Sequence, residues 1–344
     1  MKIRLAIVSL VLVAAAVLAF EVKRPGLGTY PNAAWIVRRA EEHATKHNYS
    51  ATAQTKFCYR GKLVTSDVKI LHKQPRKFRM EYASPPLRGV VIGNDGECMW
   101  RYDPELERLS ISSEAPSCLN PTGRLDLLLH NYRIEKVGEE EVAGRRAYSL
   151  VVKAKSSGDV KKRLWVDAKT YVVLRREDYD SRGRLQSATR FNTIQYVDDL
   201  PDSQFEAPTD KYRVVSRQAL GETMSSAELS KALGFAVRTP RYVPAGYKLE
   251  GYKLYKCPCE CGHESAYTRY VNGLDSISIF ESSVQSGCAR EGRCHPPDAH
   301  RETCEVRDAD HGRLASFDWK GRSFVILADV SSRELREIAS SLKQ

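Results

Sequence analysis

Residues 147–197 have the sequence AYSLVVKAKSSGDVKKRLWVDAKTYVVLRREDYDSRGRLQSATRFNTIQYV, and this stretch decides the fold class. Tyr148, Leu150 and Val152 alternate with Ser149, Val151 and Lys153, which predicts a strand with one buried face and one wet face. Short turns at residues 156–159, 167–170 and 181–183 separate four strands of similar length. The stretch therefore predicts an antiparallel meander, whose apolar face needs a cover or a ligand.

The composition indicates a folded protein of two domains. The chain has 344 residues, 42% of them hydrophobic and 28% charged, and a net charge of +11. The basic residues are spread, with the densest groups at 161–163 and 175–176, and we interpret these groups as a solvated face. They also suit anionic lipid or an acidic partner. No module that combines aromatic and basic residues is present, so we expect no nucleic-acid partner.

The N-terminus has the pattern of a signal peptide. Lys2 and Arg4 precede an apolar run, and Val17 and Ala19 are the small residues before a cleavage site. We therefore expect a signal peptide at residues 1–19 and an exported protein, periplasmic or otherwise outside the cytoplasm and soluble after cleavage. An uncleaved membrane anchor is the alternative.

The rest of the chain suggests an α+β fold that is mainly antiparallel β. A helix is expected from Asn32 to about His47, and a second, shorter helix at residues 120–132. We assign residues 20–197 to the first domain, 198–217 to a linker and 218–344 to a smaller domain. Ser225 and Ser331 each precede a glutamate by three residues, which predicts capping boxes for two helices of the smaller domain.

Several segments of the first domain resemble the lipoprotein-carrier (LolA/LppX-like) fold. These are residues 77–82 (KFRMEY), 94–102 (NDGECMWRY), 163–170 (RLWVDAKT) with Leu174 and Arg175, and the turn at 180–183. The resemblance implies a curved half-barrel sheet that is covered by helices.

Residues 240–247 (PRYVPAGY) and the last sixty residues are similar to the C-terminal domain of the RseB/MucB group. This resemblance implies a periplasmic regulator that holds an anti-sigma factor and responds to lipidic envelope components. One departure from the group is a cysteine-rich insertion at residues 255–307.

One face of the large sheet is a candidate lipid site. Its apolar residues are Phe78, Met80, Val90, Ile92, Leu150, Val152, Leu164 and Val166. Two interpretations remain open: the helices seal this face as a core, or the face forms a cavity that takes acyl chains.

The nine cysteines suggest a stapled insertion. The disulfide candidates are Cys257, Cys259, Cys261, Cys288, Cys294 and Cys304. A metal site at Cys257, Cys259, Cys261 and His263 is the alternative, although the spacing of one residue between the cysteines is unusual for zinc.

Nothing in the sequence predicts an enzyme or a cofactor. No nucleophile elbow, phosphate loop, zinc-protease motif or dinucleotide fingerprint is present. Two functions remain: a lipid-responsive regulator that binds a membrane-anchored anti-sigma factor, and a lipid or lipoprotein carrier without a signalling role. The second domain favours the regulator.

Overall fold

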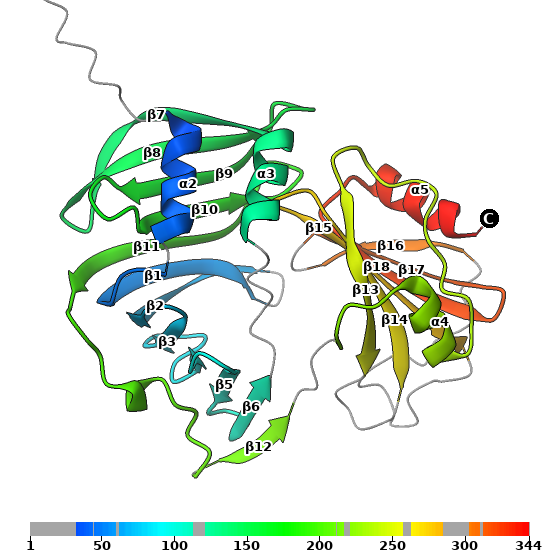
Figure 1. The fold of residues 1–344 in the computed structure, drawn as a ribbon, viewed down its shortest axis with the longest axis horizontal. Coiled ribbons are helices and arrows are strands. Elements are labelled where there is room, and N and C mark those ends of the chain that lie inside the picture. Colours follow the sequence, from blue (N-terminus) through cyan, green and yellow to red (C-terminus); the bar gives the residue numbers. More distant parts are fainter. Residues whose placement is uncertain are drawn as a thin grey trace, which may run out of the picture. The chain divides into compact units, whose positions relative to one another are not determined.

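A computed structural model describes the chain from Asn32 to Lys343, except residues 44, 60–61, 113–120, 211, 217–220, 257–262, 285–302 and 310–311. The described residues form a twelve-stranded sheet and a six-stranded sheet, with helices beside them (Figure 1). The predicted α+β class, mainly antiparallel β, is confirmed. Within these residues, no helix combines the length and the apolarity that crossing a bilayer requires.

The large sheet is continuous because its first and eleventh strands pair. Its strands are β1 (Tyr49–Tyr59), β2 (Lys62–Lys73), β3 (Lys77–Tyr82), β4 (Val91–Asn94), β5 (Met99–Asp103), β6 (Arg108–Ser112), β7 (Tyr132–Val142), β8 (Arg145–Ala154), β9 (Val160–Asp167), β10 (Val173–Tyr179), β11 (Leu185–Tyr196) and β12 (Arg213–Ser216). Their order in space is β12-β6-β5-β4-β3-β2-β1-β11-β10-β9-β8-β7. All neighbours are antiparallel except β12, which runs parallel to β6.

The predicted meander is confirmed as β8 to β11. Aspartates fix two of its turns. The Asp167 carboxylate accepts the backbone N–H groups of Lys169 and Thr170, at 2.8 and 3.2 Å. Asp180 accepts those of Arg182 and Arg184 in the next turn, at 2.9 and 2.8 Å. Such local side-chain bonds favour a turn over a continued strand.

Two helices cover part of this sheet. Helix α2 (Ala33–His43) buries Ile36, Val37 and Ala40, and helix α3 (Pro121–Asn131) buries Leu125 in the same core cluster. Figure 1 shows both helices lying across β7 to β10. Helix α2 ends at His43 rather than at about His47, four residues earlier than the sequence suggested.

One expectation about the large domain was wrong. Strand β8 has no wet face, since Ser149 and Val151 are buried as well as Leu150 and Val152. Ser149 pairs with Trp165 of the neighbouring strand β9, and the large Trp165 ring is itself buried.

Residues 198–216, most of the segment assigned to the linker, contact the first sheet. They contain a short 3-10 helix, Asp202–Gln204, and strand β12. The Trp100 indole N–H donates to the Phe205 carbonyl at 2.8 Å, and the Phe205 ring is fully buried. Phe205 therefore anchors this segment to the first sheet.

The second sheet has the order β13-β14-β15-β18-β17-β16. Its strands are β13 (Lys248–Lys256), β14 (Glu264–Val271), β15 (Ser276–Ser283), β16 (Glu305–Asp308), β17 (Arg313–Trp319) and β18 (Arg322–Ala328). Helix α5 (Ser332–Leu342) packs Leu335, Ile338 and Leu342 into the core around Phe317 and Phe324. Both predicted capping boxes are confirmed, at Ser225 before helix α4 (Ser226–Leu233) and at Ser331 before α5.

Candidate functional site

The large sheet has an inner face, which we define as the face that α2 covers. Cross-strand pairs show which residues of neighbouring strands lie on this face, and Ser66 and Ile70 are alternate residues of the same strand, β2. The pairs are Leu150 with Leu164, Leu164 with Arg176, Arg176 with Thr189, Thr189 with Thr55, Thr55 with Ser66, Ile70 with Met80, and Met80 with Ile92. Because alternate residues of a strand share a face, these pairs place Met80 and Leu150 on the same side of the sheet.

By strand register, the predicted apolar residues lie on this face, in two separate groups. Phe78, Met80, Ile92, Leu150, Val152, Leu164 and Val166 all share its register, and Val90 is buried immediately before β4. Their role in binding a ligand stays a prediction.

The inner face has two halves of different character. In the covered half, formed by β7 to β10, Leu150 and Val166 are fully buried in the cluster that includes α2 and α3. In the half formed by β1 to β6, which we call the uncovered half, the described residues place no side chain in that cluster. Ala53, Val68 and Ile70 of this half are nevertheless buried, in a second cluster that also contains Phe191 and Trp165. Phe78, Met80 and Ile92 are only half-buried there.

Aromatic rings follow the uncovered half of the inner face. Phe57 and Tyr82 meet edge to face with ring centroids 6.3 Å apart, and Tyr49 stacks on His72 at 5.0 Å. Burial raises the pKa of Tyr49 to about 12, so its phenol stays neutral at physiological pH. The uncovered half is therefore lined by neutral, mainly apolar groups.

An ionic cluster interrupts the inner face at one end, which the apolar pattern of the sequence did not reveal. The Asp178 carboxylate binds the Lys162 ammonium at 2.7 Å and the Arg176 guanidinium at 2.9 Å, and accepts the Ser187 hydroxyl at 2.8 Å. Burial opposes ionisation of Asp178, but the two cations outweigh it and lower its pKa. This end of the face is charged and hydrogen-bonded.

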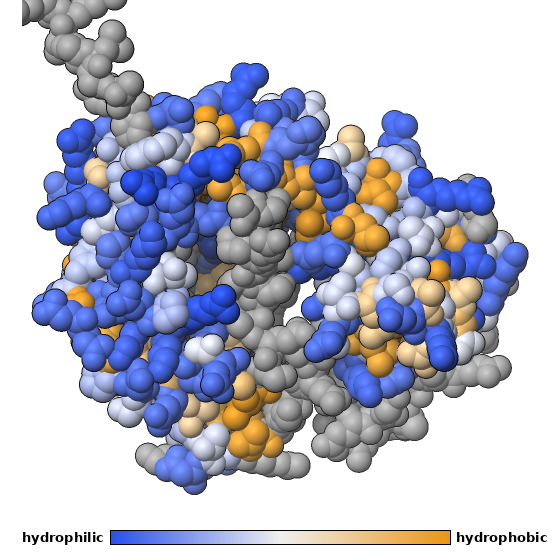
Figure 2. Space-filling view, in the orientation of Figure 1, coloured by the Kyte–Doolittle hydropathy of each residue, from blue (hydrophilic) through white to orange (hydrophobic). Residues whose placement is uncertain are grey.

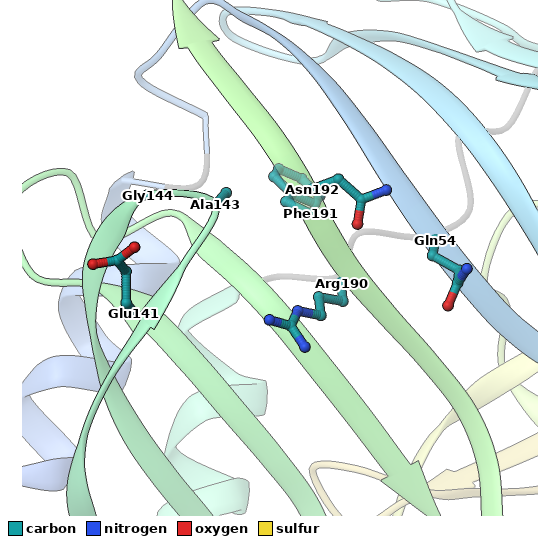
Figure 3. A pocket seen from close by; sticks show the side chains of 7 residues that line it. All are labelled: Gln54, Glu141, Ala143, Gly144, Arg190, Phe191 and Asn192. Atoms are coloured by element: carbon teal, nitrogen blue, oxygen red, sulfur yellow. The ribbon is translucent and has the colours of Figure 1, made fainter.

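A polar cavity of about 420 Å³ lies where strand β11 meets the β7–β8 hairpin. It is lined by Gln54 of β1, by Arg190, Phe191 and Asn192 of β11, and by Glu141, Ala143 and Gly144 of the β7–β8 hairpin. Figure 3 shows the Arg190 guanidinium extending from β11 toward that hairpin. Sequence reasoning missed this cavity, because it depends on the hairpin reaching strands that are distant in the sequence.

The predicted cysteine cluster lies almost entirely outside the described residues, as do residues 1–19. Cys257, Cys259, Cys261, Cys288 and Cys294 are in the undescribed segments. Of the described cysteines, Cys58, Cys98 and Cys304, no two are joined by a disulfide. His263 is buried, with Nε2 3.2 Å from the Ser265 hydroxyl. Searching only the residues that the structure describes finds no group of His, Cys, Asp and Glu side chains that could hold a metal ion.

Comparison with known sequences gives two matches. A family described only as an uncharacterized protein matches residues 89–204. An uncharacterized protein of Methanocaldococcus jannaschii is 21% identical over 291 residues, which cover 82% of this chain and 83% of that protein.

Comparison with solved structures finds MucB. MucB in complex with MucA(peri) superposes with a TM-score of 0.60 at 16% sequence identity, covering 90% of this chain and 98% of MucB. A complex of Pseudomonas aeruginosa MucA and MucB gives a TM-score of 0.59 at 16% identity and covers 89% of this chain and 96% of the matched chain. The similarity spans both sheets, which are the parts that the sequence likened to the carrier fold and to the RseB/MucB C-terminal domain. This chain therefore has the fold of MucB.

Proposed function

We propose that this chain is an exported protein that binds the acyl chains of a lipidic ligand on the uncovered half of its inner face. The observation that carries the proposal is the contrast between two apolar regions of one sheet face, which polar residues of β10, β11 and β1 separate. Leu150 is sealed under α2 and α3, whereas Met80 and Ile92 face the same way and remain half-exposed. A half-exposed apolar face on a stable sheet suits a flexible apolar ligand.

The energetics favour a chain-like ligand. Each methylene that leaves water contributes about 0.8 kcal/mol, so even a partly buried acyl chain gains several kcal/mol. The strands keep their backbone hydrogen bonds whether or not a ligand is present, so binding does not require the sheet to form. The ionic cluster at Asp178 supplies polar partners for the end of an amphiphile.

We propose further that the second sheet and its helices bind a membrane-anchored partner of the anti-sigma-factor class. This proposal draws on the fold alone, since the MucB structures of the same fold were solved with MucA. The alternative is a lipid or lipoprotein carrier with no signalling partner.

A pair of variants tests the lipid proposal. Met80→Gln places an amide on the inner face, and Glu81→Gln places the same residue one position further along β3, on the exposed side. We expect saturable binding of a fluorescent fatty acid by the unmodified protein and by Glu81→Gln. Met80→Gln should weaken it at least fivefold, because the amide loses hydrogen bonds to water when the chain covers it.

Lipid extraction with mass spectrometry on protein purified from its native host gives an independent measurement. Absence of bound lipid together with non-saturable titration would show that the inner face is only a core surface. Cross-linking in the native host tests the partner, since recovery of an exported domain of an anti-sigma factor separates a regulator from a carrier.

A further inference from the structure

Two opposite charges line the cavity beside β11 and do not pair with each other. Arg190 projects from β11 and Glu141 belongs to the β7–β8 hairpin on the other wall. Both side chains are exposed, and neither forms an ion pair or hydrogen bond with another residue that the structure describes. Neighbouring arginines of the same sheet behave differently: Arg175 is held by Glu177 and stacks on Trp165 with its guanidinium carbon 4.0 Å from the ring centroid.

The backbone around the cavity departs from regular strand geometry in two places. Strand β11 has a register shift opposite Thr52 and Ala53 of β1, so Asn192 has no Cα partner on β1. Such bulges redirect side chains and recur beside binding sites. At the hairpin tip, Ala143 has φ 54° and Gly144 has φ 70°, a tight turn in which a residue with a Cβ atom occupies the left-handed region.

The hairpin tip is held in place beside β11. Val142 is fully buried in the same core cluster as Phe191 and Trp165. Arg145, immediately after the turn, hydrogen-bonds Asp167 and lies over the Tyr196 ring at 5.0 Å. The wall with Glu141 therefore stays at a fixed place relative to Arg190, and the separation of the two charges is built into the fold.

We propose that this cavity binds a small zwitterion, with its oxyanion at Arg190 and its ammonium group at Glu141. The planar fork of a guanidinium suits two oxygens of a phosphate or a carboxylate, and the amides of Gln54 and Asn192 supply further hydrogen bonds. A volume of about 420 Å³ lies near the low end of ligand pockets, which span roughly 300–1,000 Å³. It therefore suits a small solute or the headgroup of a lipid.

Phosphoethanolamine is the probe, because it carries both groups and occurs free and as a lipid headgroup. Its binding to the full chain is measured by isothermal titration, beside inorganic phosphate and ethanolamine, which each carry one of the two groups. Arg190→Gln and Glu141→Gln each remove one charge from the cavity. Arg133→Gln, at an exposed position at the other end of β7, is the matched control.

We expect saturable binding of phosphoethanolamine, at least tenfold weaker binding by Arg190→Gln and by Glu141→Gln, and no change in Arg133→Gln. Inorganic phosphate should bind more weakly than phosphoethanolamine and should lose affinity only in Arg190→Gln. Equal affinity for phosphate and phosphoethanolamine would overturn the proposal, as would binding that is insensitive to Arg190→Gln or no binding at all. Thermal unfolding of each variant confirms that the fold is intact.

Two further measurements identify the source of the zwitterion and separate this site from the lipid face. If the ligand is a headgroup, vesicles containing phosphatidylethanolamine compete with free phosphoethanolamine, and if it is a free solute they do not. Ile92→Gln, on the inner face but outside the cluster that contains Phe191, should leave phosphoethanolamine binding unchanged. Loss of binding in Ile92→Gln would place the solute on the apolar part of the inner face and contradict the proposed site.

Discussion

The two halves of the inner face differ although one sheet and one alternation of side chains produce both. Under α2 and α3, Leu150 and Val166 are fully buried, whereas Phe78, Met80 and Ile92 of the uncovered half are half-buried. Figure 2 shows mostly hydrophilic residues over the first sheet, with hydrophobic residues near α3 and near β6 and β12. An apolar strand face thus indicates where burial is possible. Packing of helices in one half, and of other strands around Ala53 and Val68 in the other half, decides where it happens.

The largest effect should come from truncating the same kind of side chain in each half. Leu150→Ala removes a fully buried side chain and should lower the free energy of unfolding by about 2–5 kcal/mol. Met80→Ala should cost less than about 2 kcal/mol, because Met80 already contacts solvent. Urea denaturation measures both. Equal losses would show that the uncovered half is packed as a core, and would count against the lipid proposal.

The next effect tests the electrostatic end of the inner face. The pKa of Asp178 is lowered in the folded protein, since the attraction of Lys162 and Arg176 outweighs burial. Its contribution to stability is therefore complete above the unfolded-state pKa of about 3.9 and is lost as the pH falls through the lower folded value.

Asp178→Asn should lower stability at neutral pH by about 1.5–3 kcal/mol, because it weakens hydrogen bonds to two charged groups. It should also flatten the loss of stability below about pH 4. Unfolding curves between neutral and acid pH measure both effects. An unchanged pH profile would show that another carboxylate controls acid stability.

A third prediction concerns close packing between β4 and β5 on the side of the sheet opposite the inner face. Gly93 of β4 faces Trp100 of β5, and a Cβ atom at Gly93 would lie 2.3 Å from the indole ring. Gly93→Ala should therefore displace Trp100 and its bond to Phe205, with a cost of about 1–3 kcal/mol. Gly158→Ala lacks such a neighbour and serves as a packing control, although its φ of 77° makes it strained as well. A harmless Gly93→Ala would show that Trp100 is free to move.

The sequence predicted the helices, strands and turns better than it predicted which distant segments they contact. The strands and turns of residues 147–197 follow from local alternation and from turn residues such as Asp167 and Gly183, which act on their own neighbourhood. The capping boxes at Ser225 and Ser331 are equally local. Such features depend on contacts between residues that are only a few positions apart in the sequence.

Contacts between distant segments were the part that could not be predicted. The burial of Val151 depends on the packing of the neighbouring strands, and the anchoring of residues 198–216 depends on Trp100, more than a hundred residues earlier. The cavity at Arg190 combines β1, β11 and the β7–β8 hairpin. The apolar pattern found the residues of the inner face, but Met80 and Leu150 follow the same alternation, so it gave no sign that one half is open.

The smallest expected effect concerns how helices α2 and α3 are held on the sheet. Arg38 of α2 and Asp126 of α3 form an ion pair at 3.6 Å, and their side chains are 48% and 67% exposed. Solvent screens such a pair, so Arg38→Ala should change the free energy of unfolding by less than about 0.5 kcal/mol. Ile36→Ala, on the buried side of the same helix, should cost about 2–5 kcal/mol.

If α2 is held by its apolar side alone, Arg38→Ala should also leave fatty-acid binding unchanged, because the helix keeps its place over β7 to β10. If Arg38→Ala lowered the free energy of unfolding by well above 1 kcal/mol, or bound fatty acid more tightly, the ion pair would instead be what keeps α2 in place over the sheet. The boundary between the two halves would then be adjustable, since weakening one surface contact would extend the uncovered half toward Leu150. Salt separates the two cases, because screening weakens an exposed ion pair and leaves the burial of Ile36 in place.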